Sequence, residues 1–167
     1  MSVHLQAFAL AGFALVMAAA AFEDFRRLVI PNQLPIALCA LWPFYFASSA
    51  SLSGALAAIG CALAVFVVGA LLFARGWLGG GDVKLLSAAA LWAGPAGTPA
   101  LLMMTGVLGG ALALFLLLPF GSQIATAARA LLGQPIAQPE RGLAMPVPYG
   151  IAIAGAALFV ILPAHIG

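Results

Sequence analysis

The chain has 167 residues, of which 65% are hydrophobic and 6% are charged, and its mean hydropathy is +1.20. Ordinary globular domains carry about 25% charged residues, so this composition excludes a water-soluble domain. The net charge of +2 is too small and too dispersed to indicate nucleic-acid binding. The length allows one integral-membrane domain over residues 1–167 and leaves no room for a separate soluble domain.

Six apolar segments follow one another along the chain. They cover residues 3–22, 33–46, 52–74, 83–93, 99–118 and 149–164. A transmembrane helix needs roughly 20 apolar residues, so 33–46 and 83–93 are short. A four- or five-span arrangement with re-entrant segments is therefore the alternative. The sequence predicts an all-α polytopic bundle of about six transmembrane helices in the lipid bilayer.

The basic residues predict the orientation of this bundle. All six Lys and Arg residues fall in the first, third and fifth connections: Arg26, Arg27, Arg75, Lys84, Arg129 and Arg141. Because cytoplasmic loops carry an excess of Lys and Arg, both chain termini are expected to be non-cytoplasmic. The first segment is interpreted as a retained helix and not as a signal peptide, since its basic residues follow the apolar run. The 121–147 connection is then cytoplasmic, and its 122–132 part is predicted to form a short surface helix.

Two of the four acidic residues, Asp24 and Asp82, lie beside long apolar segments. A carboxylate at membrane depth is costly and by default marks a functional site. The 83–93 segment spans only ~18 Å, so Asp82 is expected to lie recessed below the cytoplasmic surface. Two carboxyl groups held close together cannot both ionise readily, and they can therefore act as an acid and a base, as in aspartic proteases. We predict that folding brings the ends of the first and fourth segments together.

Each aspartate also has a purely structural interpretation. Asp24 can form a surface ion pair with Arg26 or Arg27, and Asp82 can cap the helix that follows it. A cap is served equally well by Ser or Thr, and it does not need the three glycines at 79–81. Glycines permit positive φ and let another backbone approach closely, as a peptide substrate would.

The remaining polar and small residues predict little chemistry. Lys84 is interpreted as extending to the membrane interface, with a role in holding the substrate or the acid as the alternative. Glu23 points elsewhere than its neighbour because adjacent residues do not share a helix face. Cys39 and Cys61 lie inside apolar segments, and the two histidines lie near the chain ends. No metal site and no cofactor are expected.

Several small and aromatic residues are expected to serve the fold. Gly106 and Gly110 form a small-xxx-small pair of the kind that allows close helix approach in lipid. Trp42, Trp77 and Trp92 lie near predicted span ends, where amphipathic rings favour the membrane interface.

Taken together, these patterns resemble the type IV prepilin leader peptidases, within the wider group of GxGD membrane aspartic proteases. Three stretches carry the resemblance: Asp24 with Ile30-Pro31-Asn32, then Gly79-Gly80-Gly81-Asp82-x-Lys84, and Pro148-Tyr149-Gly150. The resemblance implies that Asp24 and Asp82 are catalytic. It implies supporting roles for Ile30, Pro31, Asn32, Gly79, Gly81, Lys84, Pro148, Tyr149 and Gly150.

The resemblance also implies a substrate and a location. The substrate is a prepilin with a short basic leader before a hydrophobic helix, cleaved at the cytoplasmic face of the bacterial inner membrane. The length is similar to the short form associated with Flp (tad-type) pili. Larger relatives carry an insertion with paired C-x-x-C motifs linked to N-methylation of the pilin. Because this chain lacks that insertion, methyltransferase activity is not expected.

Two other function classes are the alternatives. Paired intramembrane acids also occur in proton-coupled transporters, although no inverted repeat is visible here. A non-catalytic assembly protein could use its acids only to bind basic helices. In the peptidase interpretation, one aspartate activates water and the other polarises the scissile carbonyl. The sequence leaves open which aspartate has which role and what the oligomeric state is.

Overall fold

The computed structural model describes residues 2–46, 51–131 and 147–163, and every regular element in these ranges is an α-helix. The helices are α1 (Ser2–Arg27), α2 (Gln33–Phe46), α3 (Leu52–Ala74), α4 (Gly80–Leu117), α5 (Pro119–Leu131) and α6 (Tyr149–Ile161). By length and composition, α1, α3 and α4 are able to cross a membrane, and α2 and α6 are shorter apolar helices. The prediction of an all-α multi-pass membrane bundle is confirmed.

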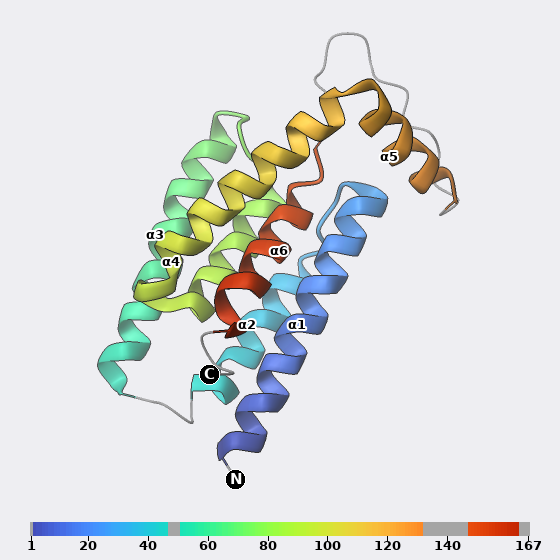
Figure 1. The fold of residues 1–167 in the computed structure, drawn as a ribbon. Helices are drawn as coiled ribbons and strands as arrows, with labels where there is room; N and C mark the ends of the chain where they lie inside the picture. Colours follow the sequence, from blue (N-terminus) through green and yellow to red (C-terminus); the bar gives the residue numbers. More distant parts are fainter. Residues whose placement is uncertain (1, 47–50, 132–146, 164–167) are drawn as a thin grey trace.

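Helix α4 is broken at Gly94, whose φ of 62° and ψ of −172° are not helical. The chain reverses direction at this break, so α4 consists of two arms, residues 80–93 and 95–117 (Figure 1). The hydroxyl of Thr98 donates a hydrogen bond of 2.6 Å to the Gly94 carbonyl, which satisfies a backbone group at the break. The two arms correspond to the predicted fourth and fifth segments, and with α1, α2, α3 and α6 they account for all six.

The helix ends gather at two ends of the bundle. In Figure 1 the end of α1 and the starts of α2, α4 and α6 lie toward the upper end, and the Gly94 break lies toward the lower end. Among the described side chains, the basic ones belong to the upper end: Arg26, Arg27, Arg75 and Lys84. These four side chains follow the segregation of positive charge that the sequence predicts, and the side chains of Arg129 and Arg141 lie outside those that the structure describes.

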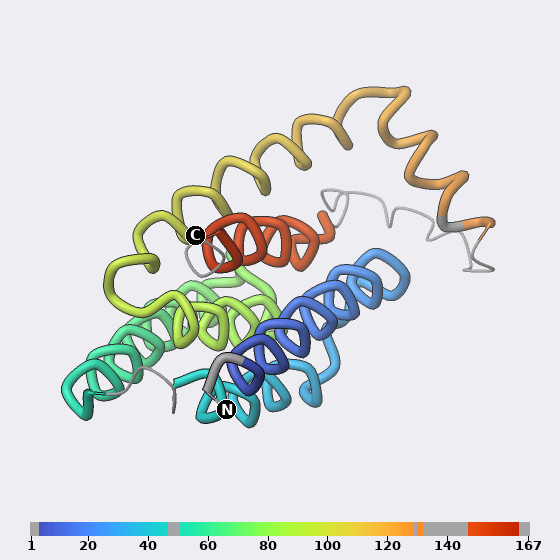
Figure 2. The backbone as a smooth tube through the Cα atoms, turned by 60° about the horizontal axis from the view of Figure 1, so that its bottom comes forward, coloured from blue at the N-terminus to red at the C-terminus, as the bar shows by residue number. Residues whose placement is uncertain are grey.

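The first arm of α4 is the centre of the bundle. Helix α4 packs against α2, α3, α5 and α6, and α1 packs against α2 and α6. Figure 2 shows α6 running between the second arm of α4 and the rest of the bundle. Eight residues of the first arm are buried: Val83, Leu85, Ser87, Ala88, Ala89, Ala90, Leu91 and Trp92.

The prediction that Trp92 lies at the membrane interface is wrong. Its ring is only 3% exposed and lies 4.7 Å from the ring of Phe13 and 5.0 Å from that of Tyr45. Its indole N–H donates a hydrogen bond of 3.0 Å to the carbonyl of Leu38. A buried indole needs such a partner, and α2 supplies it. Trp42 is buried as well, whereas Trp77 is exposed.

The Gly106–Gly110 pair does not bring two helices of this chain together. A Cβ added at either residue would meet no described atom within 4 Å. Their neighbour Gly109 makes the close approach instead, because a Cβ there would lie 2.6 Å from Cε1 of Tyr149. The second arm of α4 therefore contacts α6 at Gly109, one position before Gly110 of the predicted pair.

Two further helix boundaries differ from the expected ones. Helix α1 continues beyond residue 22 to Arg27, and α5 begins at Pro119 instead of residue 122. Helix α5 packs against α4 and leads away from the bundle, as Figures 1 and 2 show. The rest of the predicted 121–147 connection, from residue 132 to residue 146, lies outside the described residues.

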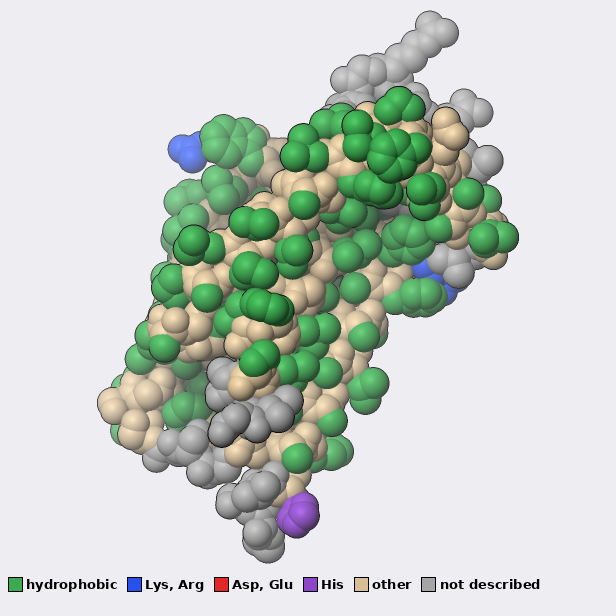
Figure 3. Space-filling view, viewed as in Figure 1, with side chains coloured by type: hydrophobic (Ala, Val, Ile, Leu, Met, Phe, Trp, Pro, Cys, Tyr) green, Lys and Arg blue, Asp and Glu red, His purple; other side chains and the backbone are tan. Residues whose placement is uncertain are grey.

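The surface is apolar in the way that a lipid environment requires. Helix α3 exposes Leu56, Leu63, Val67 and Leu71. In the space-filling view of Figure 3, hydrophobic side chains cover the face over α3 and α4, Lys and Arg lie toward the upper end, and no Asp or Glu is visible. Apolar patches of this extent are rare on soluble monomers.

Candidate functional site

Asp24 is buried where α1 meets α6. It lies in the last turn of α1 and is only 5% exposed. Its Oδ2 accepts a hydrogen bond of 2.6 Å from the backbone N–H of Gly150, in the first turn of α6. The first N–H groups of a helix have no intrahelical partner, so α6 offers this donor without losing a bond of its own. The interpretation of Asp24 as a surface residue is therefore wrong, and Arg27 forms an ion pair with Glu23 (Nε–Oε2 3.4 Å).

The Pro148-Tyr149-Gly150 stretch sets the start of α6 against Asp24. Pro148 occupies the N-cap position of α6. The ring of Tyr149 lies on Gly109, and a Cβ added at Gly150 would lie 2.8 Å from both Cβ and Oδ2 of Asp24. Real Cβ atoms do not approach that closely, so only glycine fits at position 150. Gly109 was not singled out from the sequence, because nothing local distinguishes it from Gly106 or Gly110.

Asp82 lies in the first turn of α4 and reaches back to the residue that precedes the helix. Gly79 occupies the N-cap position, and its backbone N–H donates a hydrogen bond to the Asp82 carboxylate. The structural interpretation of Asp82 as the N-cap is wrong. Asp82 is the third helical residue, and its bond to the Gly79 amide is one half of a capping box.

The two aspartates lie within electrostatic reach of each other, where the end of α1 and the start of α4 lie toward the upper end of the bundle (Figure 1). The charge of Asp24 acts directly on the carboxyl of Asp82. The prediction that the ends of the first and fourth segments come together is confirmed. Asp24 is buried and Asp82 is partly exposed, so the pair is open to its surroundings on the Asp82 side.

The glycine run at 79–81 makes a close approach within the chain itself. A Cβ added at Gly81 would lie 3.0 Å from Cβ of Ile30 and 3.5 Å from its backbone N and O. Ile30 is buried, so the connection between α1 and α2 docks on the start of α4. None of the three glycines has a positive φ. The expectation that these glycines provide positive φ is therefore wrong. Gly81 is required because Ile30 approaches it closely.

Asn32 and Lys84 form a second link between the same two stretches. Nζ of Lys84 donates a hydrogen bond of 2.8 Å to Oδ1 of Asn32. Asn32 directly follows Pro31, and its carbonyl accepts a bond of 3.2 Å from the N–H of Ile36 at the start of α2. Residues two positions apart on a helix differ by about 200° around its axis. Lys84 therefore leaves α4 on the side away from Asp82, and it does not hold the acid.

The described residues contain no group of three or more His, Cys, Asp and Glu side chains that could hold a metal ion. The chemically reactive side chains of this site are the two interacting carboxyl groups of Asp24 and Asp82. One of them is fixed by the amide of Gly150, and the other by the amide of Gly79. Such a pair can take a proton from one group and give a proton to another.

Comparison with protein families matches residues 11–114 to the type IV leader peptidase family. The matched region includes both aspartates, the 30–32 stretch and the 79–84 stretch, and it ends before residues 148–150, which the fold nevertheless places on Asp24. Comparison with curated proteins and with solved structures gives no significant match.

Proposed function

This chain belongs to the type IV leader peptidase family, and we propose that it is an aspartic endopeptidase that removes the basic leader from prepilins. The observation that carries this proposal is that Asp82 lies within electrostatic reach of Asp24, where the end of α1 and the start of α4 lie at one end of the bundle (Figure 1). A carboxyl group within an apolar bundle is costly, and a pair of interacting carboxyl groups is the arrangement that aspartic peptidases use.

The chemistry follows from the two carboxyl groups. One of them, ionised, takes a proton from the water that attacks the scissile carbonyl. The other, protonated, donates a hydrogen bond to the carbonyl oxygen, and a proton passes to the leaving amine as the C–N bond breaks. Because the two carboxyl groups interact, each protonation step describes the pair and not one residue. The roles of base and acid are therefore not assigned to individual aspartates.

The fold supports a cytoplasmic site in the bacterial inner membrane. The end of α1, which carries Asp24, Arg26 and Arg27, lies at the same end of the bundle as the start of α4 (Figure 1), and positive residues favour the cytoplasmic side. The first arm of α4 spans roughly 20 Å, less than the hydrocarbon thickness of about 30 Å. A prepilin would therefore keep its basic leader in the cytoplasm, and the cut would fall between the leader and the apolar helix.

Proton-coupled transport is the weaker alternative. Secondary carriers hold their ions near the midplane, where two halves of the protein rock against each other. Here the end of α1 and the start of α4, which carry the two aspartates, lie toward one end of the bundle (Figure 1). No methyltransferase activity is proposed, because α1 and α2 are joined by a short turn that carries no C-x-x-C insertion.

Processing of a co-expressed prepilin tests the proposal. Asp24→Asn, Asp82→Asn and the double variant are compared at matched membrane abundance, and mass spectrometry locates the cut. Asn has nearly the shape of Asp but cannot exchange a proton, so each single variant should lose cleavage as fully as the double variant. Glu23→Gln is the control and should keep most activity, because Glu23 pairs with Arg27. An Asn variant that cleaves at near the parental rate rules out the paired-carboxyl mechanism.

A further inference from the structure

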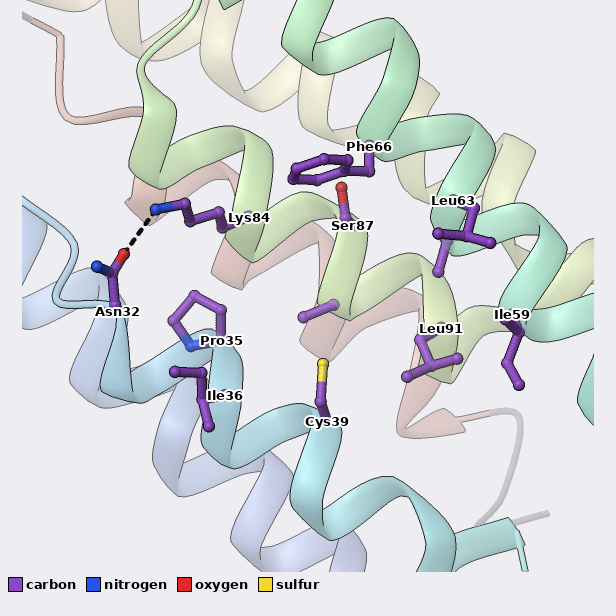
Figure 4. A pocket seen from close by; sticks show the side chains of 12 residues that line it. Asn32, Pro35, Ile36, Cys39, Ile59, Leu63, Phe66, Lys84, Ser87 and Leu91 are labelled. Carbon is purple, nitrogen blue, oxygen red and sulfur yellow. Dashed lines mark hydrogen bonds between the residues drawn. The ribbon is translucent and has the colours of Figure 1, made fainter.

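A cavity of about 590 Å³ lies between α2 and α3, with the first arm of α4 as its floor (Figure 4). Apart from Asn32, Lys84 and Ser87, its lining is apolar. Its main apolar side chains are Ile36 and Cys39 from α2, Leu63 and Phe66 from α3, and Ala88 and Leu91 from α4. The Ser87 hydroxyl donates to the Val83 carbonyl at 2.7 Å and is therefore already satisfied.

This groove opens on the outside of the bundle. Ile36, Leu63 and Phe66 are all exposed in the isolated chain. In a multi-pass membrane protein, side chains on the outer face of such helices meet the hydrocarbon of the bilayer. A volume of 590 Å³ is within the range of sites that bind discrete ligands, about 300–1,000 Å³. The groove is therefore accessible to an apolar chain from the lipid phase.

A positive charge marks the upper end of the groove. Nζ of Lys84 is bonded to the neutral Oδ1 of Asn32 at 2.8 Å (Figure 4). The ion pair between Arg27 and Glu23 does not involve Lys84. The charge of Lys84 is thus not neutralised by that carboxylate, and an ammonium group has three donors of which Asn32 takes one. An anion at this position would complete the site.

The position of the groove on α4 excludes the segment that is cleaved. Lys84, Ala88 and Leu91 share one face of α4, at spacings of four and three residues. Asp82 leaves the helix about 200° from Lys84, toward Asp24 and α6. A peptide bond held at the aspartates would lie on the other side of the helix from the groove. A bound lipid, unlike the cleaved peptide, does not have to reach the aspartates, so it can occupy the groove on this side of α4.

We propose that this groove binds one phospholipid with an acidic headgroup. One acyl chain lies along the apolar groove, and the headgroup phosphate lies at the ammonium of Lys84 and the amide of Asn32. Basic pockets between membrane helices on the cytoplasmic side recognise acidic headgroups in this way. The proposal does not depend on the peptidase function, because lipid binding is measured without any cleavage.

Photocrosslinking in vesicles tests the proposal on the full-length protein. Phosphatidylglycerol and phosphatidylcholine are prepared with the same photoactivatable acyl chain, and crosslinked peptides are mapped by mass spectrometry. With phosphatidylglycerol, crosslinks should concentrate on Cys39, Leu63 and Leu91. Lys84→Gln should reduce the preference for phosphatidylglycerol by roughly fivefold, which corresponds to about 1 kcal/mol per Lys near a headgroup.

Matched variants separate the groove from the general lipid surface. Arg75→Gln removes a basic residue at the same end of the bundle that does not line the groove, and it should leave the preference unchanged. Ala88→Phe fills the floor and should lower crosslinking of both lipids in the groove, whereas Ala57→Phe on the exposed face of α3 should not.

Three results would overturn the proposal. One is crosslinking spread evenly over the outer faces of α1 and α3. Another is an unchanged headgroup preference in Lys84→Gln. The third comes from a photoactivatable probe attached to Cys39 in membranes that also contain a prepilin. If that probe captures the pilin helix, and the pilin displaces the phospholipid, the groove is a substrate site and not a lipid site.

Discussion

The backbone N–H of Gly150 donates a hydrogen bond of 2.6 Å to Oδ2 of Asp24, across 126 positions of the sequence. This bond joins the start of α6 to the last turn of α1 at a buried point. It uses a free amide of a helix N-terminus, where negative charge is favoured. The start of α6 therefore acts as a positioning element for one of the two carboxyl groups.

Gly150→Ala should displace that carboxyl group. The added Cβ would lie 2.8 Å from Cβ and Oδ2 of Asp24, so the carboxyl must move. A misplacement of about 1 Å at a reacting group can cost roughly 100-fold in rate, and we expect a loss of prepilin cleavage of that order. Gly155→Ala on the same helix is the control. Its Cβ would lie at an ordinary 3.4 Å from Leu108, and cleavage should be retained. Parental activity of Gly150→Ala would show that the contact does not position the site.

Substitution of Gly94 should destabilise the fold through backbone strain and not through a steric clash. Its φ of 62° and ψ of −172° lie in a region that only glycine occupies readily. A Cβ at Gly94 or at Gly60 would meet nothing within 4 Å. Gly94→Ala should therefore lose about 1–3 kcal/mol through backbone strain alone, whereas Gly60→Ala within α3 should be neutral or stabilise by up to roughly 1 kcal/mol. Thermal unfolding of the purified variants measures the difference, and equal effects would contradict the strain argument.

Trp92 should contribute to stability far more than Trp77 does. Trp92→Phe removes the hydrogen bond to Leu38 and leaves space beside Phe13 and Tyr45. We expect a loss of about 1–3 kcal/mol in the free energy of unfolding. Trp77 is 74% exposed, and Trp77→Phe should change stability by less than about 0.5 kcal/mol. The same unfolding measurement compares the two, and a small effect of Trp92→Phe would show that the buried ring cluster is not a source of stability.

The sequence was sufficient to predict the helical segments and the meeting of the two aspartates. Runs of apolar residues define membrane helices because lipid forbids unpaired backbone groups. The fourth segment is predicted to end at residue 93, and α4 breaks at the next residue, Gly94. Asp24 and Asp82 were placed together because both lie at helix ends on the side of the positive residues.

Which faces of the helices pack together was not predictable from the same pattern. In lipid, a buried face and a lipid-facing face are both apolar, so hydropathy does not distinguish them. The position of Trp92 near a span end is compatible with a membrane interface, but its indole N–H donates to the Leu38 carbonyl inside the bundle. The choice of Gly109 over Gly106 depends on where Tyr149 lies, and that residue comes from the far end of the chain.

Topology is the prediction on which the location of the site depends. Single cysteines at Ser2, Ser51 and Gln138 are introduced in a chain whose native Cys39 and Cys61 are replaced, and they are labelled from each side of the membrane. Because positive residues stay in the cytoplasm, Ser2 and Ser51 should react from outside and Gln138 from inside. Ser51 directly precedes α3, at the opposite end from Arg75. Labelling of Gln138 from the same side as Ser51 would contradict the six-span topology, and with it the argument that the aspartates lie at the cytoplasmic face.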